Sequence, residues 1–449
     1  MISFGLTNQI LTLYLRELKI SDVNIGLFMT LTMIGDSIIS YILTWNANKI
    51  GNRFIMILGS FLMILASVIF ATGTSNFEYL LFAAIVGVIS PSGNDTGPFK
   101  TIEETVLANL TPPNHRPEVY AIHWVLGSIG ASLGSFLAGL SVDYLSNTLK
   151  YSMKDAYGYT FYLLVLTSFL KFISLFFISY KAEPSYIPPY KLSVSNQDEI
   201  LNQNISNEQI NSEISSQHTI SSNDYNNERR PLIRIQSTIE HDTLTGLSPT
   251  TQTILFKLLV PFMLDSFGNG FMTNAWVVYY FKFRYNVSAV LLGTLFGFSG
   301  IAMSLSAIPS AWFAKRVGPI KSSVLTQIPC GLFFIAIPIL GFNFSFGSFF
   351  YILNQMTTAF DVVPRQIILT SLIEPNDLPK VMGTVNIGKQ IARSISPYFT
   401  GYFAQYHLLW ICFLITGILL ILANIILAVY FHDLDEKIRK LEQVDHDIV

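Results

Sequence analysis

Apolar segments long enough to cross a lipid bilayer recur along this 449-residue chain. A spanning helix needs about 20 mostly apolar residues. Hydrophobic residues make up 51% of the sequence and charged residues only 12%, against about 25% charged residues in a soluble domain. The sequence therefore predicts an all-α membrane protein with twelve transmembrane helices, over residues 2–17, 23–46, 53–74, 78–110, 117–144, 157–180, 254–281, 289–312, 321–343, 347–373, 379–403 and 407–431.

A polar stretch separates the first six segments from the last six. Residues 182–252 are rich in Ser, Asn, Gln and Glu, a composition that cannot bury enough apolar surface to fold alone. We therefore expect an N-terminal six-helix bundle over 1–181, a cytoplasmic disordered linker over 182–252, a C-terminal bundle over 253–431 and a cytoplasmic tail over 432–449.

The two blocks look like copies of each other. Four patterns recur in the same order with slowly changing offsets: Trp45/Lys49/Gly51 as Trp312/Arg316/Gly318, Ser21/Gly26 as Ser288/Gly293, Asp95/Pro98 as Asp361/Pro364, and Pro117/Gly139 as Pro379/Gly401. Two pseudo-symmetric six-helix halves are typical of secondary transporters, whose substrate site lies near the midplane between the halves. By the same offsets the first helix starts late, which indicates either a naturally short helix or an incomplete N-terminus.

The distribution of charge and of ligand-type residues limits the membrane topology and the kinds of partner that the chain can have. Lys and Arg concentrate in the linker, the tail and the loops on the same side, which predicts a multi-pass membrane protein with both termini cytoplasmic. The net charge of −2 gives no field for nucleic acid. The seven histidines and two cysteines form no metal-ligand pattern, and no phosphate-binding Gly-Lys loop occurs. We expect a monomer in a lipid bilayer, with no cofactor and no metal.

Ionisable residues lie near the middle of several predicted helices. Each costs about 2.5–3.5 kcal/mol at the bilayer centre on insertion scales, so each must face a cavity or a partner. We therefore expect a polar interior around Asp36, Asp95, Lys171, Asp265, Asp361, Lys389 and Arg393, with Lys100, Glu103, Glu104 and Arg365 nearby.

Helical spacing suggests which of these charges pair. Asp361 and Arg365 are four residues apart and can pair, as can Lys100 and Glu104. Asp95, Glu103 and Asp265 then lack an obvious local partner, and a buried carboxylate without a counter-charge is easily protonated. Our hypothesis is that Asp95 and Asp265, with Glu103, bind protons, while Arg365 holds an anionic group of a small-molecule substrate. The alternative is that all these charges form static structural pairs.

Proline and glycine interrupt two predicted helices at matching places in the two blocks. Pro91, Gly93, Gly97 and Pro98 interrupt the fourth helix, and Pro364 interrupts the tenth. Broken helices at corresponding positions of two repeats point to a binding site. Trp124, Asn269, Asn274, Trp276 and Asn354 could add stacking and hydrogen bonds there, although each alone is better explained as a packing or interface residue.

Two further motifs resemble those of the major facilitator superfamily, and the resemblance covers nearly the whole chain. The loop after the second helix keeps Lys49, Gly51 and Arg53 of the family pattern G-x-x-x-D-R/K-x-G-R-R, and its second copy keeps Arg316 and Gly318. Asn48 and Lys315 replace the acid in the two copies, which weakens the expected cytoplasmic latch.

The fifth helix, with Gly130, Gly134 and Gly139, is similar to the family's antiporter motif, or serves close helix packing. The segments around Pro91–Pro98 and Asp361–Gln366 are similar to a signature of a little-characterised subgroup.

The resemblance implies a fold and a reaction class. In that fold the first, fourth, seventh and tenth helices line a central cavity, and the second and eleventh meet across the halves. Asp36 would then pair with Lys389 or Arg393 as a gate, or as a permanent bridge. We expect a transporter rather than an enzyme, with proton-coupled export of a small organic solute as the leading function. The alternatives are uptake or facilitated diffusion of a sugar or carboxylate, and a non-transporting receptor with the same fold.

Overall fold

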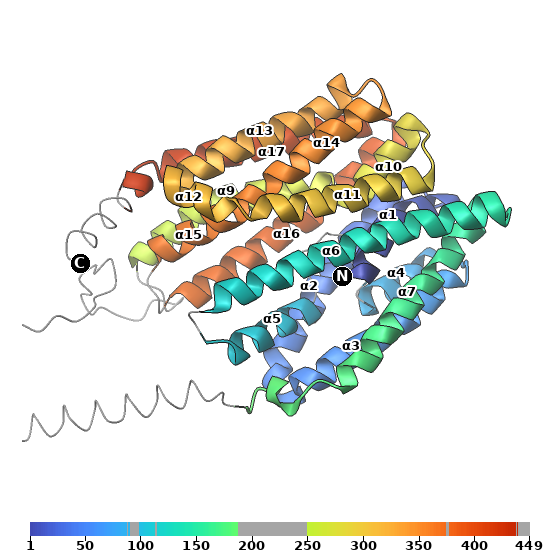
Figure 1. Ribbon diagram of the computed structural model, residues 1–449, viewed down its shortest axis with the longest axis horizontal. Coiled ribbons are helices and arrows are strands. Elements are labelled where there is room, and N and C mark those ends of the chain that lie inside the picture. The colour runs from blue at the N-terminus through green and yellow to red at the C-terminus, as the bar shows by residue number, and fades with distance from the viewer. Residues whose placement is uncertain are drawn as a thin grey trace, which may run out of the picture.

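The computed structural model describes residues 1–87, 89, 98–112, 115–186, 249–373, 377–436 and 438. Within these residues every regular element is a helix, and the helices form two groups that lie side by side (Figure 1). Most of the predicted linker lies outside the described residues. Its first residue ends a short 3-10 turn, Tyr180–Ala182, and the first helix of the second half begins at Pro249, inside the predicted linker.

The N-terminal half follows the predicted order of helices. Its elements are α1 (Ile2–Glu17), α2 (Asp22–Ile50), α3 (Asn52–Ala71), α4 (Phe77–Val86), α5 (Pro98–Leu110), α6 (Arg116–Asp143), a π-helical turn (Tyr144–Thr148) and α7 (Met153–Phe176). α4 ends at Val86 and α5 begins at Pro98, and the predicted interruption at Pro91, Gly93 and Gly97 lies outside the described residues.

The C-terminal half contains more interruptions than the sequence predicts. Its elements are α9 (Pro249–Phe271), α10 (Asn274–Tyr285), α11 (Ala289–Ala307), α12 (Ser310–Val317), α13 (Pro319–Leu340), α14 (Phe344–Thr358), the 3-10 turn η4 (Ala359–Asp361), α15 (Val362–Leu372), α16 (Leu378–Gln405) and α17 (Leu409–Tyr430). The tenth predicted helix is broken at Asp361, just before Pro364. The segments predicted over 254–281 and 289–312 are helical, but each is interrupted once, after Phe271 and after Ala307, while Thr251–Tyr285 still forms one candidate membrane span.

Side chains from neighbouring helices satisfy the backbone at these breaks. Thr400 donates to the carbonyl of Phe271 at the end of α9 (2.7 Å), and Ser310 donates to the carbonyl of Phe360 in η4 (2.9 Å). Unpaired backbone groups are tolerated at membrane depth only when protein or water provides partners. Hydroxyl residues on α12 and α16 therefore allow the helices to break inside the bundle.

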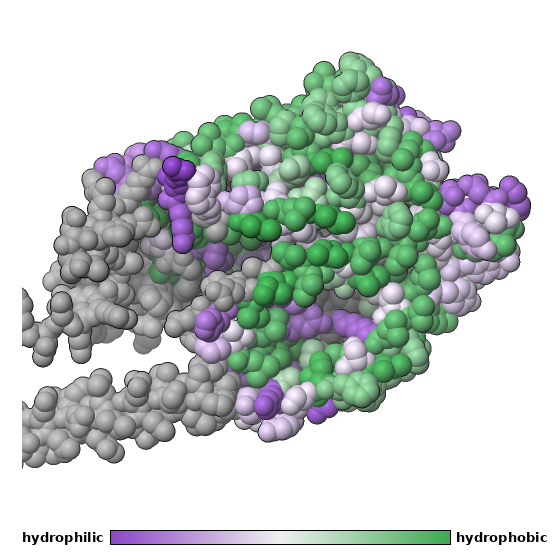
Figure 2. Space-filling view, in the orientation of Figure 1, coloured by the Kyte–Doolittle hydropathy of each residue, from purple (hydrophilic) through white to green (hydrophobic). Residues whose placement is uncertain are grey.

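The outer surface has the character expected of a membrane protein. Among the described residues, eight helices are long and apolar enough to cross a bilayer. Hydrophobic residues cover the long sides of the molecule, while hydrophilic residues gather towards its two ends (Figure 2). We call the end that carries residues 186 and 249 the linker end, and the opposite end, where α1 meets α2, the distal end.

Paired glycines join the two halves with the symmetry of the repeat. A Cβ atom on Gly26 of α2 would lie 2.8 Å from the Cα atom of Gly401 of α16. The repeat-related Gly293 of α11 has the same relation to Gly139 of α6, at 3.0 Å. Real Cβ atoms hardly ever come that close to backbone, so both seams need glycine. The same pairs of positions meet in both seams, which supports two halves related by a pseudo-two-fold axis.

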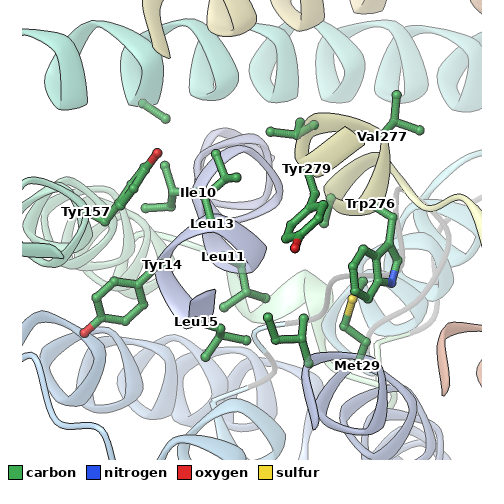
Figure 3. Packing of buried hydrophobic residues seen from close by; sticks show 14 of the residues in the cluster. Ile10, Leu11, Leu13, Tyr14, Leu15, Met29, Tyr157, Trp276, Val277 and Tyr279 are labelled. Atoms are coloured by element: carbon green, nitrogen blue, oxygen red, sulfur yellow. The ribbon is translucent and has the colours of Figure 1, made fainter. Parts of the chain in front are cut away.

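Among the described residues, the largest apolar cluster joins the two halves towards the distal end. The largest cluster of buried hydrophobic side chains contains residues of both halves, including Tyr14, Phe161, Trp276 and Phe413. Figure 3 shows side chains of α1 beside Trp276 and Tyr279 of α10 and Met29 of α2. Nearer the linker end the buried clusters are separate, one around Phe262 and Ile368 in the second half and one around Ile55 and Leu175 in the first.

Polar contacts reinforce the junction at the distal end. Arg16 of α1 contacts both carboxylate oxygens of Asp22 at 3.1 Å, and Tyr279 of α10 donates to Asp22 Oδ1 at 2.7 Å. The side chain of Gln405 accepts from the backbone of Asp22 at 3.2 Å. The halves are therefore closed together at the distal end and have independent cores at the linker end.

Candidate functional site

A small cavity of about 50 Å³ lies between the two halves. It is bordered by α1 and α6 of the first half and by α10, α11 and α14 of the second. Among the described residues its lining carries no charge. The polar lining residues are Asn8, Gln9, Ser128, Ser132, Ser135, Asn274, Ser299, Tyr351 and Gln355.

Two adjacent amides on α1 are the least satisfied polar groups of this lining. Asn8 and Gln9 are 4% and 3% exposed. Both amide atoms of Asn8 and the Oε1 atom of Gln9 lack a hydrogen-bond partner within the described protein. A buried polar group left unpaired costs about 1–3 kcal/mol. The cavity therefore presents donors and acceptors that a bound solute or water would satisfy.

A charged cluster lies in the C-terminal half, at the break of the tenth helix. Arg365 Nη1 of α15 lies 2.7 Å from Asp265 Oδ2 of α9, and its Nε contacts Asp361 Oδ2 of η4. The three side chains are largely buried, and the guanidinium also lies over the ring of Phe262, 5.2 Å from its centroid. One guanidinium thus holds two carboxylates from two different elements.

Uncharged groups complete this cluster. Ser323 Oγ of α13 contacts Asp361 Oδ1 and lies 3.2 Å from Asn424 Oδ1 of α17. Asn269 of α9 donates from Nδ2 to Asp265 Oδ1 at 3.3 Å. The pairing of Asp361 with Arg365 is as the spacing predicts. The expectation that Asp265 lacks a partner is wrong, because α15 and α9 are brought together only by the fold.

The matching cluster of the N-terminal half is more open. Glu103 Oε1 of α5 lies 3.3 Å from Lys171 Nζ of α7, and the two side chains are 32% and 36% exposed. His123 Nε2 of α6 is 3.9 Å from Glu103 Oε2. The expectation that Glu103 lacks a partner is therefore also wrong. Asp95 and the side chain of Lys100 lie outside the described residues, so their predicted roles remain predictions.

The contacts of Arg365 bear on its predicted role. Its guanidinium already has two counter-charges inside the protein, which argues against binding a substrate anion. The predicted gating residues lie on helices that pack together: Asp36 is buried on α2, and Lys389 and Arg393 lie on the adjacent α16. Their opening and closing role remains a prediction.

The two copies of the loop motif share an arrangement that sequence reasoning missed. Gly51 and Gly318 have positive φ angles of 92° and 101°, which favour glycine. Beside Gly51, the backbone N–H of Asn52 donates to Glu183 Oε2 at 2.9 Å. Beside Gly318, the N–H groups of Ile320 and Lys321 donate to the carboxylate of Asp435, both at 2.9 Å.

These carboxylates cap the starts of α3 and α13. Each belongs to the segment that follows the last helix of its own half. Negative charge at a helix N-terminus is stabilising, so Glu183 and Asp435 hold each loop against its own half. They do so in the two loops in which Asn48 and Lys315 replace the acid of the family pattern. The side chains of Lys49, Arg53 and Arg316 are not part of these capping contacts.

The glycines of the fifth helix are packing residues in the structure. A Cβ atom on Gly134 would lie 2.0 Å from the carbonyl oxygen of Ile2, and one on Gly130 would lie 3.2 Å from Met1 Cβ. Gly139 belongs to the seam with Gly293. Close packing of α6 on α1 and α11 therefore accounts for all three positions.

Two halves of interrupted helices around a central cavity define a membrane transporter fold. The family model of the Major Facilitator Superfamily matches residues 1–365 and 258–446. The chain belongs to the major facilitator superfamily, whose members are transporters rather than enzymes, and its helices form the twelve-helix fold of that family.

Similar proteins agree with this assignment. An uncharacterized membrane protein of Saccharomyces cerevisiae is 42% identical over 441 residues, covering 98% of this chain and 93% of the relative. Among solved structures, a D-xylose-proton symporter superposes with a TM-score of 0.64 at 12% identity, covering 94% of both chains. A POT family transporter gives a TM-score of 0.64 at 14% identity, covering 96% of this chain and 93% of that one. The inward-open xylose transporter XylE from E. coli gives 0.62 at 12% identity, covering 94% and 92%.

Proposed function

We propose that the protein is a secondary active transporter that carries an uncharged, hydrogen-bonding small solute by alternating access, coupled to protons. The observation that carries this proposal is the pair of unsatisfied amides, Asn8 and Gln9, in a cavity between the halves whose described lining has no charge. A solute with hydroxyl or amide groups satisfies these donors and acceptors. A charged solute would lose its hydration there without gaining a counter-charge.

This chemistry separates the two substrate classes that the sequence leaves open. A sugar-like or polyol-like solute fits the uncharged lining better than a carboxylate. The D-xylose-proton symporter and the POT family transporter among the structural neighbours support the transporter fold, and the choice of an uncharged solute rests on the lining of the cavity. Serine hydroxyls of α6 and α11 would extend the hydrogen-bonding surface around the solute.

The arrangement of the cores supports alternating access. The halves share a core at the distal end and have separate cores at the linker end. With the linker in the cytoplasm, as Lys and Arg placement predicts, this conformation faces inward. Opening to the other side would require Tyr279 and Gln405 to leave Asp22. Export remains the predicted direction; the glycines that suggested it are explained by packing.

The test uses purified full-length protein in liposomes, with a panel of labelled sugars, polyols, amides and carboxylates. We expect flux of an uncharged solute that rises when a proton gradient is imposed. Gln9→Leu and Asn8→Leu should each lower the affinity for that solute roughly tenfold, the effect of about one hydrogen bond of 1–1.5 kcal/mol. Asn46→Leu is the matched control, since that amide lies on α2 away from the cavity and bonds the carbonyl of Ile42.

Two results would contradict the proposal. Flux restricted to anionic solutes would exclude an uncharged binding site. Binding of the solute without flux, with or without a gradient, would favour the receptor alternative instead.

A further inference from the structure

The charged cluster of the C-terminal half contains two carboxylates and one guanidinium, so it carries one negative charge too many when all groups are ionised. Asp265 and Asp361 both contact Arg365. Burial of an unbalanced charge is costly, and one additional proton would make the cluster neutral. The position of that proton can be read from the hydrogen-bonding partners of each carboxylate oxygen.

Neither described contact of the Asp265 carboxylate oxygens offers an acceptor for a carboxyl proton. Its Oδ2 faces the N–H of Arg365 and its Oδ1 faces the amide N–H₂ of Asn269. Guanidinium and amide nitrogens donate hydrogen bonds and cannot accept them. A carboxyl O–H on Asp265 would therefore point at a donor.

Asp361 has a suitable acceptor. Its Oδ1 contacts the hydroxyl of Ser323, which can both accept and donate. That hydroxyl has a second acceptor beside it, Asn424 Oδ1, at 3.2 Å. The orientation of the Asn424 amide is fixed because its Nδ2 donates to the carbonyl of Leu420 at 2.9 Å.

Ser323 has one hydrogen to give and two acceptors to serve. When Asp361 is ionised, Ser323 donates to the carboxylate and Asn424 Oδ1 is left without that donor. When Asp361 is protonated, its O–H donates to Ser323 and the serine donates to Asn424, so every group in the chain is satisfied. Ser323 and Asn424 are 0% and 1% exposed, so water does not replace the missing bond easily.

We propose that Asp361 is the proton-carrying residue of the transport cycle, with Ser323 and Asn424 as positioning residues that hold its protonated form. This proposal deepens the proposed proton-coupled transport and rests on it. The proton adds to Asp361 Oδ1 from hydronium and forms an O–H bond there. On release that bond breaks, its electron pair stays on the carboxylate, and the proton returns to water.

The other titratable groups around η4 leave this assignment in place. The charged groups that face Asp361 are Arg365 and, through it, Asp265. The elements packed against η4 also carry Cys330 and Tyr351, both buried and uncharged as thiol and phenol, and Lys315, Arg316 and Lys321, which are exposed. α11 contributes no titratable side chain.

The location of Asp361 explains how a proton could act on the solute site. Asp361 forms the last residue of the break between α14, which lines the cavity through Tyr351 and Gln355, and α15. Arg365 ties α15 to α9. A change in the charge of Asp361 therefore acts at η4, between α14, which lines the cavity, and α15, which lies nearer the linker end.

The test needs no substrate, so it can fail or succeed separately from the transport assay. Infrared pH-difference spectra of the purified full-length protein should show a carboxyl C=O band that shifts in D₂O. Asp361→Asn should abolish the band and Asp265→Asn should retain it. Ser323→Ala should shift its frequency, whereas Ser322→Ala, a change at the neighbouring buried serine whose hydroxyl has no partner, should not.

A milder variant keeps the test valid if Asp361→Asn does not fold. Asn424→Leu removes the second acceptor, so Ser323 is free to donate to the ionised carboxylate of Asp361. The proton affinity of Asp361, measured from the pH at which the band appears, should then fall roughly tenfold. A band that survives Asp361→Asn, a band lost in Asp265→Asn, or no titrating carboxyl band at all would overturn the assignment. If the band behaves as expected while no solute is transported, only the proposed transport function fails.

Discussion

The seam between α2 and α16 and the seam between α6 and α11 are built alike. Gly26 meets Gly401 in one and Gly293 meets Gly139 in the other, and these four glycines are related by the repeat. The loop ends are also alike, because Glu183 caps the start of α3 and Asp435 caps the start of α13. Where backbones of the two halves approach closely, both seams place a glycine opposite a glycine.

The interiors of the two halves differ. The C-terminal half holds Arg365 against two carboxylates that are each 8% exposed. The N-terminal half holds Glu103 and Lys171 at about a third exposure, and contributes uncharged amides of α1 to the cavity. The difference teaches that the repeat preserves the packing of the seams while charge is divided unequally at the helix breaks, where Arg365 and its two carboxylates are largely buried and Glu103 and Lys171 are not.

The largest expected effect tests this division of charge. Arg365→Leu leaves two buried carboxylates without their counter-charge and should lower the free energy of unfolding by about 3–5 kcal/mol. Lys171→Leu removes the partner of a more solvated acid and should cost about 1 kcal/mol or less. Thermal unfolding of both variants in detergent measures the contrast.

A second substitution serves as the control for charge. Asp265→Asn in the Arg365→Leu background removes one of the two orphaned charges and should recover part of the stability. Equal losses in Arg365→Leu and Lys171→Leu would show that the halves bury their charges alike.

The next effect tests the seams. Gly401→Ala places a Cβ against the backbone of Asp22 and Gly26 and should destabilise the protein by about 1–3 kcal/mol, with Gly139→Ala showing a similar loss. Gly383→Ala in the same helix as Gly401 meets nothing within 4 Å and should be neutral or stabilising by up to about 1 kcal/mol. If Gly→Ala lowers the stability at only one of the two seams, the seams are not energetically equivalent.

Much of the fold was predictable because it depends on local or repeated patterns. Apolar runs predict most of the helices, proline predicts the break before Pro364, and the spacing of Gly26, Gly139, Gly293 and Gly401 predicts the repeat. The break between α9 and α10 was missed because no proline marks it. There, Thr400 of a distant helix satisfies the freed carbonyl of Phe271.

The candidate site was less predictable because its pairs are distant in sequence. Asp361 and Arg365 share a helical segment, but Asp265 reaches Arg365 only through the packing of α9 and α15. Asn8 and Gln9 carry no charge, so an analysis of buried charges passes over them. Two adjacent amides near the middle of a predicted membrane helix are a usable signal, since both need partners.

The smallest expected effects test the likeness of the two loop ends. Asp435→Asn disturbs a carboxylate that accepts two backbone hydrogen bonds, whereas Glu183→Gln disturbs one that accepts a single bond. Loss of a helix cap costs about 0.5–2 kcal/mol, so we expect Asp435→Asn near the upper end and Glu183→Gln near the lower.

Asp433→Asn provides the control for this pair, because that side chain is 62% exposed and should change stability by less than about 0.5 kcal/mol. Thermal unfolding of the three variants under one condition gives the order. The N–H groups of Ile320 and Lys321 donate to different oxygens of Asp435, and in a carboxamide an NH₂ group takes the place of one of these oxygens, so one N–H group then faces a donor. If Asp435→Asn is as harmless as Asp433→Asn, the carboxylate is not what holds this loop, and the apparent likeness of the two loop ends has no energetic basis.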